Sequence, residues 1–194
     1  MNDVLRMLTG GDLRSDGAAD QVAEIVLENP DLFDDLFDGI DVEQDLIRGR
    51  AAHSLEKVSR VRPEMFLPHI DQLLEIARCE NLPMARWHYA MIFTNLAVFP
   101  DLIGRLLPLL FEMLEDESVF VKSWAISGLT VCARLYPEHT DKITKSIASH
   151  KDDKSIAIRS KVRNAMTCLL TPTQPLSKGW VKSERLLRDS ANFR

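Results

Sequence analysis

The strongest constraint in this sequence is a proline that returns at a nearly fixed interval and is followed by an acid in four of five cases. These prolines are Pro30, Pro63, Pro100, Pro137 and Pro172, so the intervals are 33, 37, 37 and 35 residues. A fixed period of this size is typical of solenoids, in which each unit buries its apolar face only against its neighbours. Proline suits the first helical turn, where its missing N–H would have no partner, and the acid complements the helix dipole. The repeated dipeptide therefore predicts one helix start per unit.

Apolar residues lie at fixed distances after each proline. Ten residues on are Ile40, Leu73, Leu110 and Ile147, and six residues on are Leu36, His69, Leu106 and Ile143. This spacing of four residues is that of an amphipathic helix. Pro68 and Pro108 fall inside these first helices, and we expect them to kink the helices because each lacks a backbone donor.

A second helix precedes each following proline and begins near a basic residue. These basic residues are Arg48, Arg86, Lys122 and Arg159. Seven residues on lie Leu55, Phe93, Leu129 and Met166, and ten residues on lie Val58, Leu96, Cys132 and Leu169. Small residues sit between, where helices must approach closely: Ala51, Ala52, Ala90 and Ala125. An acidic turn joins the two helices of each unit, as in "EDESVF" and "HKDDKS".

This arrangement resembles the HEAT repeat of the HEAT/armadillo superfamily over residues of about 30 to 172. Asp20–Asn29 reads as the second helix of a degenerate first unit. The resemblance implies an all-α, right-handed solenoid of about four to five helix-pair repeats. It also implies ladders between a turn acid and a second-helix arginine. The matching positions are Glu80 and Arg86, Asp116 and Lys122, Asp153 and Arg159, and, with a slip of one residue, Asp41 and Arg48. Lys122 departs from the pattern, because an ammonium lacks the planar fork of arginine.

The regions outside the repeat complete the predicted organisation. Residues 1–17 are expected to form a flexible N-terminal arm, residues 18–172 the solenoid, and residues 173–194 a loop and a capping helix from about Gly179 to Asp189. Trp180, Val181 and Leu187 would give that helix its apolar stripe. The tail either caps the open edge of the last unit or, being basic, docks on a partner.

Composition and motifs exclude several functions. No apolar run approaches the length of a membrane span, and the polar, acidic start is not a secretory signal. The scattered Cys79, Cys132 and Cys168 indicate structural thiols in a reducing cytoplasm. The five histidines form no H-x-x-x-H or H-E-x-x-H pair, and no phosphate-binding loop or nucleophile elbow occurs. We therefore expect neither an enzyme nor a cofactor or metal site.

The charge is unevenly distributed along the chain. The net charge of −5 divides into −11 over residues 1–47 and +6 over residues 48–194. Such asymmetry can mark a nucleic-acid or acidic-partner surface at one end, or simply differently solvated helix faces.

The remaining candidate is a binding surface. In HEAT-like solenoids the second helices line the concave face. Counting two, five and nine from each leading basic residue predicts an exposed ridge of Arg50, His53, Lys57, His88, Met91, Asn95, Trp124, Ser127, Val131, Lys161, Asn164 and Cys168. Trp124 is either the anchor of binding or packs between units. We expect a protein-binding scaffold that takes a protein or peptide with acids, since Arg50, Lys57 and Lys161 supply positive charge.

Two alternatives to a protein scaffold stay open. The first is nucleic-acid binding, suggested by Arg50, Lys57, Lys161 and Arg163. HEAT-like DNA glycosylases make that reading concrete, but their chemistry needs an acid that the predicted ridge lacks. The second is an assembly factor resembling HEAT-repeat lyases, for which no residue argues.

Overall fold

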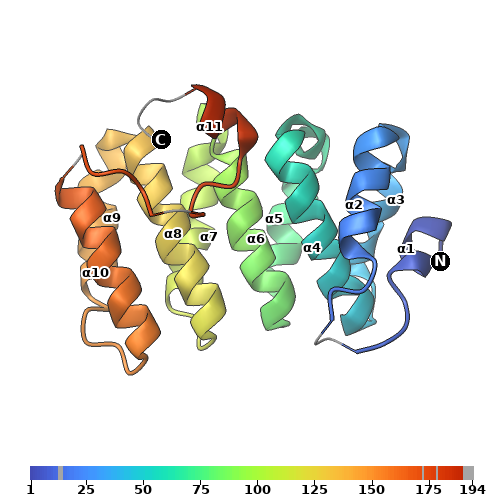
Figure 1. Cartoon of the computed structure of the whole chain (residues 1–194), viewed down its shortest axis with the longest axis horizontal. Coiled ribbons are helices and arrows are strands. Elements are labelled where there is room, and N and C mark those ends of the chain that lie inside the picture. Colours follow the sequence, from blue (N-terminus) through green and yellow to red (C-terminus); the bar gives the residue numbers. More distant parts are fainter. Residues whose placement is uncertain (13–14, 172, 178, 190–194) are drawn as a thin grey trace. The chain divides into compact units, whose positions relative to one another are not determined.

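The computed structural model describes residues 1–12, 15–171, 173–177 and 179–189. Within these residues the chain forms eleven α-helices and five 3-10 helices, with no strand (Figure 1). The predicted all-α class is confirmed for the described part. None of these helices is both long enough and apolar enough to cross a membrane. The chain divides into two compact units, Met1–Ile92 and Phe93–Arg194, which are described separately.

The first unit contains α1 (Asp3–Met7), α2 (Ala19–Glu28), α3 (Phe33–Phe37), α4 (Asp45–Val61) and α5 (Ile70–Cys79). Its 3-10 helices are η1 (Pro30–Leu32), η2 (Asp38–Asp41) and η3 (Pro63–His69). Helix α6 (Pro83–Leu96) passes from this unit into the second. The predicted second helix at Asp20–Asn29 is α2, which lies beside α4 (Figure 1).

The second unit contains α7 (Ile103–Leu114), α8 (Val119–Leu135), α9 (Thr140–Ala148), α10 (Ile156–Leu170) and α11 (Glu184–Asp189). Its 3-10 helices are η4 (Pro100–Leu102) and η5 (Pro137–His139). Helix α8 packs against both α7 and α10, and α9 packs against α10 (Figure 1).

The repeating prolines begin 3-10 helices that lead directly into the first α-helix of each pair. Pro30, Pro63, Pro100 and Pro137 are each the first residue of such a helix, and each is followed by its acid. Pro172 lies outside the described residues. The predicted helix start is therefore confirmed, but the α-helix proper begins later. In η3 the delay is longest, because Pro68 has no N–H to donate to an α-helical bond. Helix α7, in contrast, continues through Pro108.

The register read from the prolines places the core correctly. Ile40, Leu73, Leu110 and Ile147 are all fully buried, as are Leu55, Phe93 and Leu129 on the second helices. Met166 is only half-buried, in contrast to its equivalents on α4, α6 and α8. The predicted small residues at close approaches, Ala51, Ala52, Ala90 and Ala125, have no exposed surface. In α8 the backbone comes so close to Thr94 that a Cβ on Gly128 would collide with its hydroxyl.

Buried ion pairs connect neighbouring helix pairs within each unit. Arg48 of α4 donates through Nε to Glu80, at 2.8 Å, in the turn after α5. Lys122 of α8 donates to Asp153, at 2.7 Å, in the turn after α9. In both ion pairs the carboxylate thus belongs to the turn of the following helix pair. Arg48 and Arg159 also donate to backbone carbonyls in the turn that precedes their own helix. The residues of the ladder are those predicted, but the ion pairs join Arg48 to Glu80 and Lys122 to Asp153 of the following turn. Arg86 and Arg159 donate to the backbone carbonyls of Glu80 and Asp153 in their own turns. Arg48 also pairs with Asp45.

Part of the predicted N-terminal arm, residues 1–17, is packed. Val4, Leu5 and Leu8 are buried, and the Asn2 side chain caps α1 by accepting from the Leu5 amide at 2.9 Å. Asn2 also donates to the Asp35 carbonyl at 2.9 Å, which attaches α1 to α3. The description of the whole arm as flexible is thus corrected for residues 2–8. The reason is that these apolar side chains fall on one face of a short helix.

The C-terminal helix is shorter than predicted. It begins at Glu184, because Gly179 has a positive φ of 81° and the Ser183 hydroxyl accepts from the Leu186 amide at the helix start. Trp180 and Val181 are buried as expected, but Leu186 is buried in place of Leu187, which is 40% exposed. The later start shifts the buried face by one residue.

A truncation of Leu129 tests this register. Because Leu129 is fully buried, Leu129→Ala should lower the unfolding free energy by roughly 2–5 kcal/mol. Leu170, which is 70% exposed at the end of α10, provides the control, and Leu170→Ala should change stability by no more than about 0.5 kcal/mol. Urea unfolding of both variants measures the difference, and equal stabilities would contradict the register.

Candidate functional site

The structure buries seven of the twelve ridge residues predicted on the second helices. Buried are Arg50, His88, Met91, Asn95, Ser127, Val131 and Cys168; half-buried are His53, Lys57, Trp124 and Lys161; exposed is Asn164. The prediction that the first seven are exposed is wrong. The second helices pack side by side, as α8 does with α10, and segments from the chain's two ends cover what remains.

Arg50 on α4 is surrounded by the segment that joins α1 to α2. Its guanidinium donates to four backbone carbonyls, at 2.7–3.1 Å: those of Leu8, Gly10, Asp12 and Ser15. Gly17 closes the contact from the other side, where a Cβ would lie 2.6 Å from the guanidinium carbon. A planar fork of five donors suits this task, since it binds several carbonyls at once. Arg50 therefore holds an irregular peptide segment by its backbone.

Acids of the same N-terminal region pair with the next two ridge residues. Asp20 accepts from His53 Nε2 at 2.9 Å and lies 3.1 Å from Lys57 Nζ, and Asp16 lies 3.4 Å from His53 Nδ1. Burial alone would raise the pKa of Asp20, but the hydrogen bonds from Lys57 and His53 lower it below its usual value. His53 and Lys57 of α4 thus already have acidic partners within the chain. We call Arg50, His53 and Lys57 the N-terminal face.

His88 on α6 lies beneath this face as a neutral imidazole. Its ring centroid is 4.8 Å from that of His53. Trp87 Nε1 donates to His88 Nε2 at 3.2 Å, so Nδ1 carries the proton and donates to the Met84 carbonyl at 2.8 Å. Burial, with the nearby His53, lowers the pKa of His88 to about 3. This residue is a structural core histidine.

In the second unit the chain's own C-terminal segment lies across α8 and α10 (Figure 1). Leu176, Val181 and Leu186 form one apolar cluster with Val131 of α8 and Cys168 of α10. Both helix residues belong to the predicted ridge. We call the surface formed by Val131, Cys168, Trp124, Lys161 and Arg134 the C-terminal face.

Lys161 is enclosed by aromatic rings on this face. Its Nζ lies 4.4 Å from the ring centroid of Trp180 and 5.4 Å from that of Trp124. Lys182 approaches Trp124 from the tail, at 5.8 Å. Burial, and then the charge of Lys182, lowers the pKa of Lys161 to about 8. Trp124 is thus half-buried and packed beside Lys161 of α10 and Lys182 of the tail.

Arg134 holds the backbone of the tail much as Arg50 holds the N-terminal segment. It donates to the Cys168 carbonyl at 2.8 Å and to the Gln174 carbonyl at 2.5 Å. Nearby, the Cys168 thiol is 3.6 Å from the Pro175 carbonyl. The two faces therefore share one chemistry, an arginine that binds carbonyls beside half-buried side chains.

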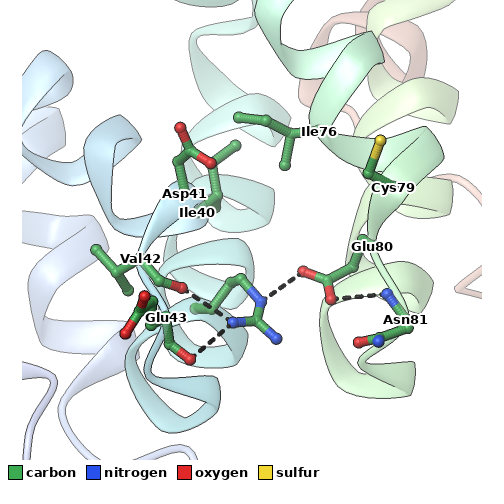
Figure 2. A pocket seen from close by; sticks show the side chains of 9 residues that line it. Ile40, Asp41, Val42, Glu43, Ile76, Cys79, Glu80 and Asn81 are labelled. Atoms are coloured by element: carbon green, nitrogen blue, oxygen red, sulfur yellow. Dashed lines mark hydrogen bonds and ion pairs between the residues drawn. The ribbon is translucent and has the colours of Figure 1, made fainter.

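Two open pockets lie away from these faces. The first, of about 240 Å³, is lined by Ile40, Asp41, Ile76 and Cys79 together with the Arg48–Glu80 pair (Figure 2). Glu80 there also accepts from the Asn81 amide at 2.9 Å. The second, of about 480 Å³, lies between α7 and α9, where Lys142 is 4.7 Å from the Phe111 ring centroid. Arg48, Glu80 and the Asn81 amide of the first pocket are engaged with one another, so it reads as a seam between repeats.

The described residues bring together no group of three His, Cys, Asp or Glu side chains that could hold a metal ion. Sequence reasoning missed Asp16, Asp20, Arg134 and Leu176, which complete the two faces. The excess of acids in residues 1–47 could have indicated Asp16 and Asp20, because α4 carries the basic residues that they pair with. No periodic pattern marked the others, since they lie in irregular segments or at a helix end.

No protein-family model and no curated protein matches the sequence. Among solved structures, a designed armadillo repeat protein has a similar fold, with a TM-score of 0.59 over 86% of this chain and 80% of that chain, at 13% identity. At this identity the likeness shows the fold alone. Together with the repeated helix pairs, it confirms the predicted class: the chain is an all-α solenoid of armadillo/HEAT-like helical repeats.

The neutral His88 should make stability depend on pH. Its folded pKa lies below the ordinary 6.5, so the unfolded state binds more protons between these values and stability falls as the pH drops from about 6.5. Between pH 7 and 5 the wild type should lose about 2 kcal/mol more than His88→Asn, which cannot ionise. Urea unfolding at both pH values measures this, with His139→Asn as the control. Equal losses in wild type and His88→Asn would contradict it.

Replacing Arg50 should release the N-terminal segment. Lysine keeps the charge but cannot reach four carbonyls, so Arg50→Lys should lower the unfolding free energy by roughly 2 kcal/mol or more. Amide hydrogen exchange in residues 8–17 should quicken by about tenfold or more. Arg62→Lys, at a half-exposed arginine paired with Glu64, is the matched control. Unchanged exchange at residues 8–17 in Arg50→Lys would refute this role.

Proposed function

We propose that this protein is a non-enzymatic binding scaffold whose second helices hold segments of partner proteins. Armadillo-like repeats commonly mediate protein binding, and stacked helix pairs offer extended surfaces rather than a deep pocket. The observation that carries the proposal is that second helices in each unit already hold an irregular segment of the same chain. Arg50 binds one such segment by four carbonyls, and Arg134 binds the other.

This chemistry is suited to peptides in general. Every peptide offers backbone carbonyls, so an arginine such as Arg134 would supply affinity with little dependence on sequence. Selectivity would come from side chains packed near Trp124 and Val131, because buried aromatic and aliphatic anchors dominate binding energies. A partner in an extended or irregular conformation fits both contributions.

The contacts of Arg50, Lys57 and Lys161 bear on the charge expected of the partner. The expectation of an acidic peptide rested on Arg50, Lys57 and Lys161. Arg50 and Lys57 are matched by carbonyls and Asp20 of the same chain, and Lys161 is enclosed by two indole rings. We therefore propose a protein partner without requiring acids. Contacts within the chain engage Arg50, Lys57 and Lys161, three of the four cations on which nucleic-acid binding rested, whereas Arg163 is exposed on α10. One exposed arginine does not favour that alternative over a protein partner. For the compartment we keep the cytoplasm as a proposal, based on the free thiols.

Trp124 provides the test. Peptides selected from a displayed random library on the full-length protein should bind the C-terminal face. Trp124→Ala should weaken them by roughly 2 kcal/mol or more, about thirtyfold, by fluorescence polarisation. Phe120→Ala, on the same helix but 63% exposed, should bind like the wild type.

Two results would count against the scaffold. One is that no peptide is enriched, or that Trp124→Ala binds like Phe120→Ala. The other is binding of an oligonucleotide with a steep log–log loss of affinity in salt, which would favour nucleic acid instead.

A further inference from the structure

The C-terminal tail consists here of the described residues Thr173–Ser177 and Gly179–Asp189. It contacts α8 and α10 through a few anchors. Leu176, Trp180, Val181 and Leu186 are each less than 9% exposed, while Leu187 and Arg188 are exposed. Three of these anchors enter the cluster with Val131 and Cys168, and Val98 and Leu135 pack against its edge. The tail therefore covers the C-terminal face with separated side chains.

The backbone of the tail is not part of the helical repeat. Its own hydrogen bonds are local turns, from Gln174 to Thr171 at 2.8 Å and from Trp180 to Ser177 at 3.1 Å. Helix α11 has only six residues, fewer than an isolated helix needs to be stable. Contacts to the face come from side chains and from Arg134, which donates to the Gln174 carbonyl. A bound peptide is held in the same way, because its conformation is ordered by contacts with the surface beneath it.

Trp180 is the aromatic anchor of the tail. Trp180 is 6% exposed, and its ring centroid lies 4.4 Å from Lys161 Nζ. The Trp124 ring centroid is farther from the same atom, at 5.4 Å. A desolvated ammonium against an indole face is a favourable contact that many aromatic side chains could supply. At the other end of the tail, Arg185 lies over the Phe99 ring at 5.6 Å. The aromatic position is thus defined by Lys161 and can be filled by another ring.

We propose that the tail is an intramolecular ligand of the C-terminal face, displaced by a partner segment that presents the same anchors. That segment carries an aromatic ring for Lys161, aliphatic side chains for Val131 and Cys168, and a free backbone carbonyl for Arg134. This inference rests on the proposed function and adds both the partner's chemistry and its regulation. A tethered segment competes at an effective concentration of up to millimolar, so the tail weakens partner binding without any new contact.

The experiment weakens the contact between the tail and the C-terminal face without changing any residue of that face. Full-length Trp180→Ala/Leu186→Ala removes two anchors from the tail only, and Leu187→Ala, at a 40% exposed position of the same helix, is the control. The probe is a synthetic, labelled peptide of residues 173–189. It should bind the double variant about tenfold or more tighter than it binds the wild type or Leu187→Ala. A peptide carrying the two alanines should lose binding to the double variant.

Each outcome decides one point. Equal binding of the probe to wild type and double variant, or no binding to a double variant that keeps its helical circular dichroism, overturns the intramolecular ligand. A mass corresponding to two chains in light scattering would show that tails exchange between copies, which also overturns displacement by a partner. The library peptides of the preceding section separate the two proposals. If they bind wild type and double variant equally at this face, the scaffold stands and the displaceable tail falls.

A second measurement covers the case in which the double variant fails to fold. In the wild type, amide hydrogen exchange at residues 176–186 should be faster than in the centre of α8, because the tail opens without the repeat. Exchange of both segments only through one common unfolding event would refute the proposal.

Discussion

Each helix pair buries its apolar face only against the pair beside it, and the other features of the structure follow from this constraint. The fully buried columns of Leu73 and Leu110 on first helices, and of Leu55 and Leu129 on second helices, are the result. Met166, the equivalent residue on α10, is only half-buried. Where no equivalent helix pair covers a face, other segments cover it or it stays open to a partner.

Ion pairs between a second helix and the following turn fix how neighbouring helix pairs stack. Arg48–Glu80 and Lys122–Asp153 place a cation of one second helix on the turn that leads to the next. Both acids are almost entirely shielded, and the hydrogen bond from Lys122 lowers the pKa of Asp153. Because removing one partner would leave a buried charge, these pairs penalise any other stacking. They also explain why the pocket at Arg48 is a seam between repeats.

The two chain ends share the arginine–carbonyl contact with a second helix but differ in the contacts that accompany it. The N-terminal region uses charge and carbonyls, with Asp20 and four backbone oxygens directed at α4. The C-terminal tail uses apolar anchors on α8 and α10. The first is built into the core through Val4, Leu5 and Leu8, whereas the second is held by four spaced side chains. This difference explains why the C-terminal tail, and not the N-terminal segment, is the displaceable one.

The sequence by itself determined the repeat, the helix pairs and the core register, because periodic burial leaves periodic apolar residues. It also identified the ladder residues, whose charges recur at equal spacing. Only the tertiary structure decided which ridge residues are exposed. Arg50 and His88 look like surface residues in the pattern, but irregular segments and neighbouring side chains cover them. Contacts between a helix and an irregular segment far away in the chain have no period, so no spacing in the sequence can reveal them.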